Sequence, residues 1–278
     1  MAPPQSAAAS AGAQQSGPAS LDGLPFEMQR LIMSHAPTLD VLSALVHASP
    51  ELHRVYAQDR LHILRDFLQQ SFGDMLFDAH AAYVSGTDAF QMSREESMLW
   101  DFLNDYQQRR KTTSPAALAA QLSLEELIEI ARFHTSIVEP LTERYAIWAL
   151  AALSSSPKAR PLSEIERRRI QRGMYRLQIF CNVCGSRGEG RSVTNRIEDP
   201  VQRSRILSFF PAWQVEEILC VHAFGQDTYG GVFDQVAWDL NEERNPKYSH
   251  VDINSVNEDL LLFSDGPEYC KLRLSRQA

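Results

Sequence analysis

Residues 24–56, LPFEMQRLIMSHAPTLDVLSALVHASPELHRVY, carry the sharpest helix signals of the chain and form a unit too small to stand alone. Pro25 fits the first position of a helix, where its missing N–H is not needed. Thr38 or Asp40 can cap a second helix, and Ser49-Pro50 has the pattern of an N-cap followed by a proline at N1. The stretch therefore predicts three helices in succession.

Apolar side chains recur at helical spacing along each of these expected helices. In the first two helices they form the stripes Leu24, Met28, Leu31 and Ile32, and then Val41, Leu42, Leu45 and Val46. The third helix keeps an apolar face to about residue 70. A stripe of this kind serves either as core or as a surface for a partner.

The composition limits the class of protein. The chain has 278 residues, of which 44% are apolar and 22% charged, as in a globular protein of one large or two modest domains. Its net charge of -8 argues against a nucleic-acid binder. Neither a secretion signal nor an apolar run of about 18 residues is present, so we expect a soluble protein of the cytoplasm or nucleus, with no membrane partner.

The expected organisation is mainly α, with a disordered arm at 1–20, a three-helix module at 21–70 and an irregular helical domain at 71–278. Ser-x-x-Glu capping boxes predict helix starts at Ser93, Ser123 and Ser163, and Ser114-Pro115 predicts a further start. We expect the nearly all-apolar segment 145–153 in the core. A subdivision near 154–161 and short strands at 260–263 and 271–274 are left open.

The cysteines offer one candidate metal site. Cys181 and Cys184 form a Cys-x-x-Cys pair, half of a tetrahedral zinc site, which Cys220 and His222 could complete. Both pairs are expected within helices, whereas a zinc knuckle places its cysteines on a tight turn. Because free cysteine is often buried, packing at a helix end is the favoured interpretation.

The remaining chemical signals are weak. Arg168, Arg172 and Arg176 fall on one face of an expected helix, where a solvated face or pairing with acidic neighbours is favoured over phosphate binding. The glycine-rich segment 185–190 lacks the ending of a phosphate loop. No residues indicate a nucleophile, a base or an oxyanion site. We therefore expect no enzymatic activity, no cofactor and no metal.

The order and spacing of several short motifs resemble the F-box, most closely the F-box-like proteins of filamentous fungi. These motifs are Leu24-Pro25-Phe26-Glu27-Met28, Leu31-Ile32-Met33-Ser34, Leu39-Asp40, Leu45-Val46 and Ala48-Ser49-Pro50. Gln29 and Ala36 stand where the family usually has Leu, and no Trp follows in the third helix.

The resemblance implies that the module docks on the adaptor subunit of an SCF-type cullin-RING ubiquitin ligase, while the region after residue 90 recruits an unknown protein substrate. The partner-binding residues would be Leu24, Pro25, Met28, Leu31, Ile32, Leu42, Leu45 and Val46. The alternative is a structural or regulatory helical protein with a degenerate F-box packed into its own core. Burial of Met28, Leu31 and Ile32 against helices after residue 90 would favour that alternative.

Overall fold

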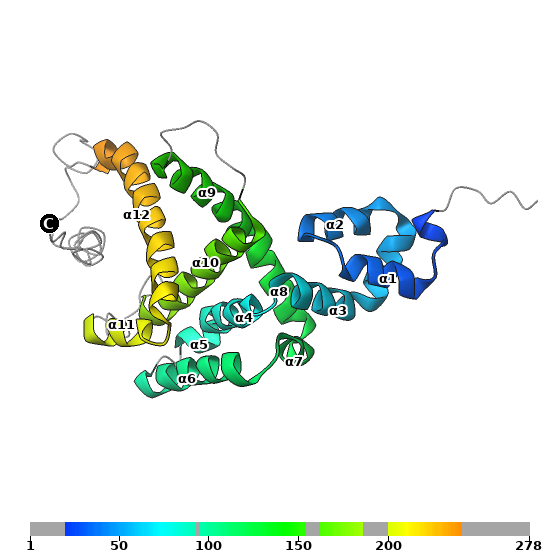
Figure 1. Ribbon diagram of the computed structural model, residues 1–278, viewed down its shortest axis with the longest axis horizontal. Coiled ribbons are helices and arrows are strands. Elements are labelled where there is room, and N and C mark those ends of the chain that lie inside the picture. Colours follow the sequence, from blue (N-terminus) through cyan, green and yellow to red (C-terminus); the bar gives the residue numbers. More distant parts are fainter. Residues whose placement is uncertain (1–19, 93–94, 154–161, 186–199, 241–278) are drawn as a thin grey trace, which may run out of the picture. The chain divides into compact units, whose positions relative to one another are not determined.

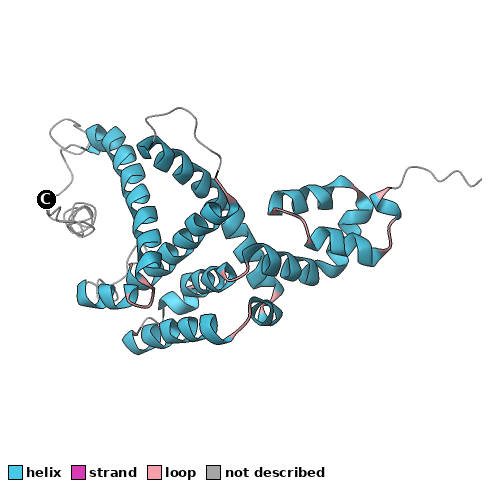
Figure 2. Ribbon diagram, viewed as in Figure 1, coloured by secondary structure: helices cyan, strands magenta, loops and turns pink. Residues whose placement is uncertain are grey.

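The computed structural model describes residues 20–92, 95–153, 162–185 and 200–240 (Figure 1). Every regular element among these residues is helical, which confirms the predicted mainly α class (Figure 2). The chain divides into two compact units, Met1–His222 and Ala223–Ala278. The predicted strands, the subdivision near 154–161 and, apart from Ser20, the N-terminal arm fall outside the described residues.

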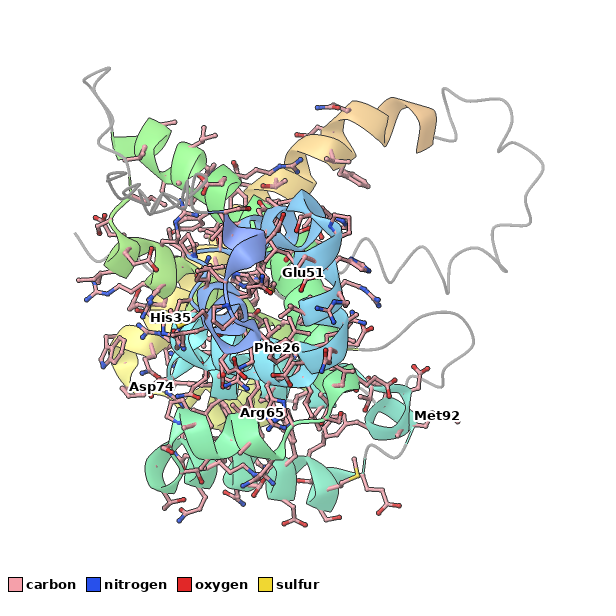
Figure 3. All side chains as sticks on the ribbon, turned by 90° about the vertical axis from the view of Figure 1, so that its right-hand side faces the viewer. Phe26, His35, Glu51, Arg65, Asp74 and Met92 are labelled. Carbon is pink, nitrogen blue, oxygen red and sulfur yellow. The ribbon has the colours of Figure 1, made fainter. Side chains whose placement is uncertain are left out.

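The predicted module contains four helical elements. They are η1 (Leu21–Gly23), α1 (Phe26–Ser34), α2 (Leu39–Ala48) and α3 (Pro50–Phe72). Figure 3 looks onto this side of the structure and labels Phe26 and His35 at the two ends of α1 and Glu51 in the first turn of α3.

Further helices follow along the chain. They are α4 (Met75–Gly86), α5 (Asp88–Met92), α6 (Glu96–Thr112), α7 (Pro115–Gln121), α8 (Leu124–Phe133), the π-helical turn η2 (His134–Val138), α9 (Glu139–Leu153), α10 (Glu164–Cys184), α11 (Pro200–Leu207) and α12 (Ala212–Leu240). The last of these crosses from the first compact unit into the second.

Most of the predicted helix starts have the expected caps. The side chains of Thr38, Ser49 and Ser114 each accept a hydrogen bond from a backbone N–H in the first turn of the helix that follows. Ser123 and Ser163 form complete capping boxes with Glu126 and Glu166, which satisfy two backbone donors reciprocally. Ser93 lies outside the described residues, and α6 begins after Glu95 without a side-chain cap.

Helix α3 connects the module to the rest of the first unit. It packs on α1 and α2, and also on α4, α7 and α8. The helix is kinked at Asp59, whose φ of -127° and ψ of 31° are not helical. Arg30 of α1 reaches this kink, where its Nη1 lies 3.1 Å from Oδ2 of Asp59. The ion pair therefore links α1 to the kink of α3.

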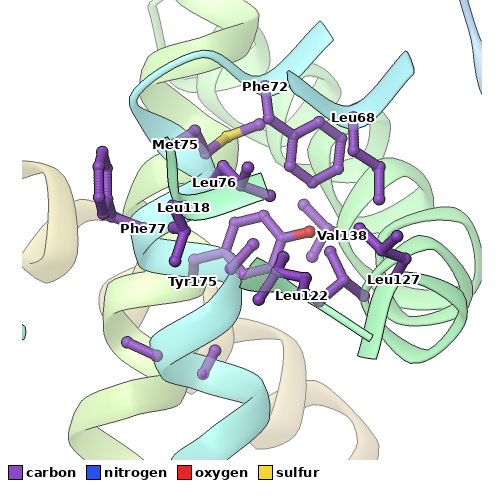
Figure 4. Close-up of a cluster of buried hydrophobic side chains, with 14 of the residues drawn as sticks. Leu68, Phe72, Met75, Leu76, Phe77, Leu118, Leu122, Leu127, Val138 and Tyr175 are labelled. Atoms are coloured by element: carbon purple, nitrogen blue, oxygen red, sulfur yellow. The ribbon is translucent and has the colours of Figure 1, made fainter. Parts of the chain in front are cut away.

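The core of the first unit is built around α3, α4 and α10. Helices α4 and α10 pack extensively on each other, and α7 and α8 cover α3 and α4. Figure 4 shows the buried side chains at this junction, among them Leu68, Phe72, Leu76, Leu127 and Tyr175. Each of these five side chains is at most 3% exposed, so they form continuous apolar packing between helices distant in sequence.

The predicted core position of segment 145–153 is wrong for most of its described side chains. On α9 Thr142 and Ala146 are buried, but Ile147 is 71% exposed. Helix α9 packs mainly on η2 and α10. The helix carries apolar residues on all of its sides, but its neighbours cover only one side. Its composition alone therefore overstated its burial.

Gly173 permits close packing between α10 and the first turns of α12. A Cβ added at this position would lie 2.9 Å from the backbone oxygen of Glu217. We expect Gly173→Ala to lower the free energy of unfolding by about 1–3 kcal/mol, because this overlap outweighs the better helix propensity of alanine. Urea unfolding of both proteins would measure the difference.

Gly225 of α12 provides the matched control, because a Cβ built there meets no atom within 4 Å. Gly225→Ala should leave stability unchanged or raise it by up to about 1 kcal/mol. Equal effects of the two substitutions would contradict the packing argument.

Candidate functional site

The predicted partner-binding residues on and just before α1 include three exposed apolar side chains. Met28 and Leu31 are each 47% exposed, and Pro25 before the helix is also exposed. Leu24 and Ile32 are half-buried. Helix α1 packs chiefly on α3 and α2. The side of α1 that carries Met28 and Leu31 is thus available to a partner.

Two of the predicted partner-binding residues require correction. Leu42 and Val46 of α2 are only 3% and 6% exposed and belong to the core. They border a cavity of about 340 Å³ between α2, α3 and α8. Helical spacing places them on the inner face of α2, so neither contributes a docking surface. Leu45, beside them on the same helix, is half-buried.

The inner face of α1 is formed by Gln29 and Met33, which are 1% and 0% exposed. Gln29 Nε2 donates hydrogen bonds to the carbonyl oxygens of Leu21 and Asp22, at 3.0 and 3.2 Å. The glutamine that departs from the F-box pattern therefore fastens η1 to α1. Ala36, the other departure, is also buried.

Two further exposed apolar side chains of the predicted module were not among the predicted partner-binding residues. Leu21 of η1 is 45% exposed, and Val41 of α2 is 39% exposed. Leu21 precedes the first expected helix, and Val41 lay in the predicted stripe of the second helix without being selected. An apolar pattern gives the spacing of a face, but not which face looks outward. We define the α1 surface as Leu21, Pro25, Met28 and Leu31.

A second notable cluster is buried and ionic. Arg176 of α10 and Asp78 of α4 are each 1% exposed, and Arg176 Nη2 lies 3.1 Å from Asp78 Oδ2. The Tyr106 hydroxyl donates to Asp78 Oδ1. Burial, followed by the nearby Asp78 carboxylate, raises the pKa of Tyr106 well above its ordinary value. The cluster joins three helices from within the core.

The other arginines of this face also pair with acidic groups, in agreement with one of the two favoured interpretations. Arg172 donates to both carboxylate oxygens of Glu217, at 2.6 and 2.9 Å. Arg168 pairs with Glu164 on the exposed side of α10. The expectation of a solvated face is wrong for Arg176. These contacts show a structural ion-pair network along α10.

The candidate zinc ligands do not assemble in the described residues. Cys184 is buried at the end of α10, while Cys181 and Cys220 are exposed. Across the described ranges, no group of three or more His, Cys, Asp or Glu side chains is placed to hold a metal ion. The described part of the chain likewise has no helix with the length and apolar character needed to cross a membrane.

Comparisons with known proteins leave the family open. No protein-family model, no curated protein and no solved structure matches this chain. The class that can be stated is a mainly α protein with an exposed apolar stripe on its first full helix.

Proposed function

We propose that this chain is an F-box-like protein, a substrate receptor that binds the adaptor subunit of an SCF-type cullin-RING ubiquitin ligase through its α1 surface. The observation that carries the proposal is the 47% exposure of both Met28 and Leu31. The alternative predicts that Met28, Leu31 and Ile32 are buried against helices after residue 90; Ile32 is half-buried, but Met28 and Leu31 are exposed. Their exposure therefore supports a docking role.

The energetics suit a small apolar interface. Fully burying a Leu or Met side chain contributes about 1.5–3 kcal/mol, and a few such anchors supply most of the affinity in many interfaces. The α1 surface has four exposed positions over one helix and the turn before it. This arrangement suits a partner with an apolar groove. The region after residue 90 would then recruit the protein substrate.

Two observations favour the alternative, a structural or regulatory helical protein. Leu42 and Val46, which would contribute to docking in the F-box interpretation, are buried. In addition α3 packs on helices outside the module as well as on α1 and α2. Part of the F-box-like sequence thus stabilises this chain itself, and binding must be measured directly.

The test is a binding titration of the full chain with purified adaptor subunit. The wild type should bind, and the double variant Met28→Asp/Leu31→Asp should bind at least about a hundredfold more weakly, because it removes two apolar anchors and would place two carboxylates in the interface. Both positions are half-exposed, so the fold should persist. Circular dichroism and the urea midpoint would verify this.

Ile147→Asp is the control, because it introduces a carboxylate at an exposed apolar position on α9, outside the α1 surface. This variant should bind the adaptor as the wild type does. Absence of wild-type binding up to a Kd of about 1 mM would reject the ligase proposal and favour the alternative.

A further inference from the structure

A cavity of about 600 Å³ lies between α4, α8 and α10. This volume is within the range of about 300–1,000 Å³ that is typical of ligand sites. The apolar and aromatic side chains among its lining residues are Ala79, Ala82, Tyr83, Ile130, Phe133 and Tyr175. The cavity thus offers three aromatic rings and a surface for the aliphatic part of a ligand.

The charge on the cavity wall is negative. Glu129 lines it, whereas no Lys, Arg or His occurs among its described lining residues. Asn182 Nδ2 donates to Ala82 O and Ser85 Oγ, both at 3.1 Å. Gln178 Nε2 donates to Asn182 Oδ1 at 2.8 Å. Both donors of the Asn182 amide and one of the two donors of Gln178 are therefore used within the wall, which favours a ligand that brings donors of its own.

Two helices also end at this cavity. Gly86, the last residue of α4, and Gly185, which follows the last residue of α10, both line it. The C-terminus of a helix carries about half a negative charge, so cations are favoured there by about 0.3–1 kcal/mol at each helix. The capped start of α5 at Thr87 follows directly and opposes the α4 terminus, so the negative potential of the cavity comes mainly from the end of α10 and the Glu129 carboxylate.

The pKa of Tyr83, one of the two tyrosines that line the cavity, responds to the negative charge around it. Burial raises the pKa of Tyr83, and the carboxylates of Glu126, Glu125 and Glu129 raise it further. A negative surrounding that disfavours a phenolate favours a bound cation. Aromatic faces such as those of Tyr83 and Phe133 also attract guanidinium and ammonium groups.

We propose that this cavity binds the arginine or lysine side chain of a protein segment, with Glu129 as the counter-charge. The cavity exceeds the volume of one basic side chain, so an apolar neighbour in the same segment would contact Ala79 and Ala82. The inference rests on the proposed function in one respect, because it takes the segment to belong to the recruited substrate.

The present partner of Glu129 does not prevent such binding. Arg132 Nη1 contacts Glu129 Oε1 in an (i, i+3) pair whose side chains are 65% and 38% exposed. Exposed pairs of this kind contribute little to stability and exchange readily with solvent and with competing cations. A basic side chain held in the cavity can therefore displace or share this contact.

The test is a titration of the full chain with the peptide acetyl-Ala-Leu-Arg-Leu-Ala-amide and with its citrulline counterpart. Citrulline keeps the size of arginine but is neutral. The arginine peptide should bind, and both citrulline and the variant Glu129→Gln should weaken binding about tenfold or more. Equal binding of the two peptides would overturn the proposal, and so would a failure of the arginine peptide to bind.

Glu27→Gln is the matched control, because it removes the same charge from an exposed position of α1 outside the cavity. It should change binding less than about twofold. An effect equal to that of Glu129→Gln would show general attraction to an acidic surface and would overturn the proposal. Urea unfolding of both variants would establish that they are folded.

Agmatine, a free guanidinium compound, distinguishes a protein segment from a small cation. It should bind more weakly than the arginine peptide, and equal affinity would overturn the assignment to a protein segment. The assay contains no adaptor subunit. Failure of adaptor binding and failure of this inference are therefore separate results.

Discussion

Replacing Arg176 with methionine should lower the free energy of unfolding by about 3–5 kcal/mol, the usual cost of leaving one member of a buried ion pair without its partner. The pair with Asp78 lies among α4, α6, α10 and the beginning of α12. Methionine keeps much of the volume, so the loss reports charge more than packing. Urea unfolding with a constant m-value would measure it.

The network around Arg176 explains why its removal is costly. Asp78 accepts a hydrogen bond from Tyr106, and Arg110 Nε lies 3.8 Å from its Oδ1. Arg176 supplies the closest cation to Asp78 and also approaches Glu217, at 3.7 Å. Its guanidinium lies over the ring of Phe210, 5.3 Å from the centroid. Without it, the Asp78 carboxylate keeps the neutral Tyr106 donor and one cation, Arg110, at the longer distance of 3.8 Å.

The double variant Arg176→Met/Asp78→Leu separates charge from packing. Replacing both members with apolar groups should recover much of the loss, because neither charge is then buried alone. Arg168→Met, on the same helix, removes an exposed pair with Glu164 and should change stability by less than about 0.5 kcal/mol. A cost for Arg176→Met similar to that of Arg168→Met would contradict the proposed role of the buried pair.

The sequence predicted helix starts better than burial. A cap is a local arrangement, since a serine side chain meets a backbone donor two or three residues later, and the starts at Ser49, Ser114, Ser123 and Ser163 were predictable for that reason. Burial depends on helices far away in sequence. The arginines of α10 form ion pairs in two different environments, with Arg168 at the surface and Arg176 in the core. Their spacing alone could not have predicted this difference.

The candidate site shows the same limit. The stripe Leu24, Met28, Leu31 and Ile32 was predicted as one face of a helix; Met28 and Leu31 lie on the outer face of α1, whereas Leu24 and Ile32 are half-buried. The inner face contains Gln29 and Met33, and the polar Gln29 interrupts its apolar pattern. The 3.6-residue period therefore detected the more apolar face without indicating which face is buried. On α2 the predicted apolar stripe instead contains the buried residues Leu42 and Val46, so part of it faces the core.

Acidification should destabilise the protein through His134, which is buried beside two aromatic rings. Its ring centroid lies 4.6 Å from that of Phe72, and its Nδ1 is 3.1 Å from the Tyr175 hydroxyl. Burial lowers the pKa of His134 from 6.5 to about 4. The nearby small cavity is also lined by Glu139, Glu164 and Arg167.

The sign of the effect follows from proton binding. Between pH 6.5 and about 4, the unfolded chain binds a proton at His134 that the folded chain does not. The stabilisation from this histidine is therefore complete above pH 6.5 and is lost as the pH falls through the folded-state pKa. At about 1.4 kcal/mol for each pH unit between the two pKa values, the full loss is roughly 3 kcal/mol.

His134→Gln should remove this pH dependence, because glutamine keeps a polar group for Tyr175 but does not titrate in this range. The free energy of unfolding of the wild type, relative to that of the variant, should fall by about 2–3 kcal/mol between pH 7 and pH 4.5. His53→Gln, which changes an exposed histidine of α3, controls for the loss of a histidine as such. Parallel pH profiles for wild type and His134→Gln would show that the buried imidazole is protonated without cost, and the packing around η2 would then not exclude the charge.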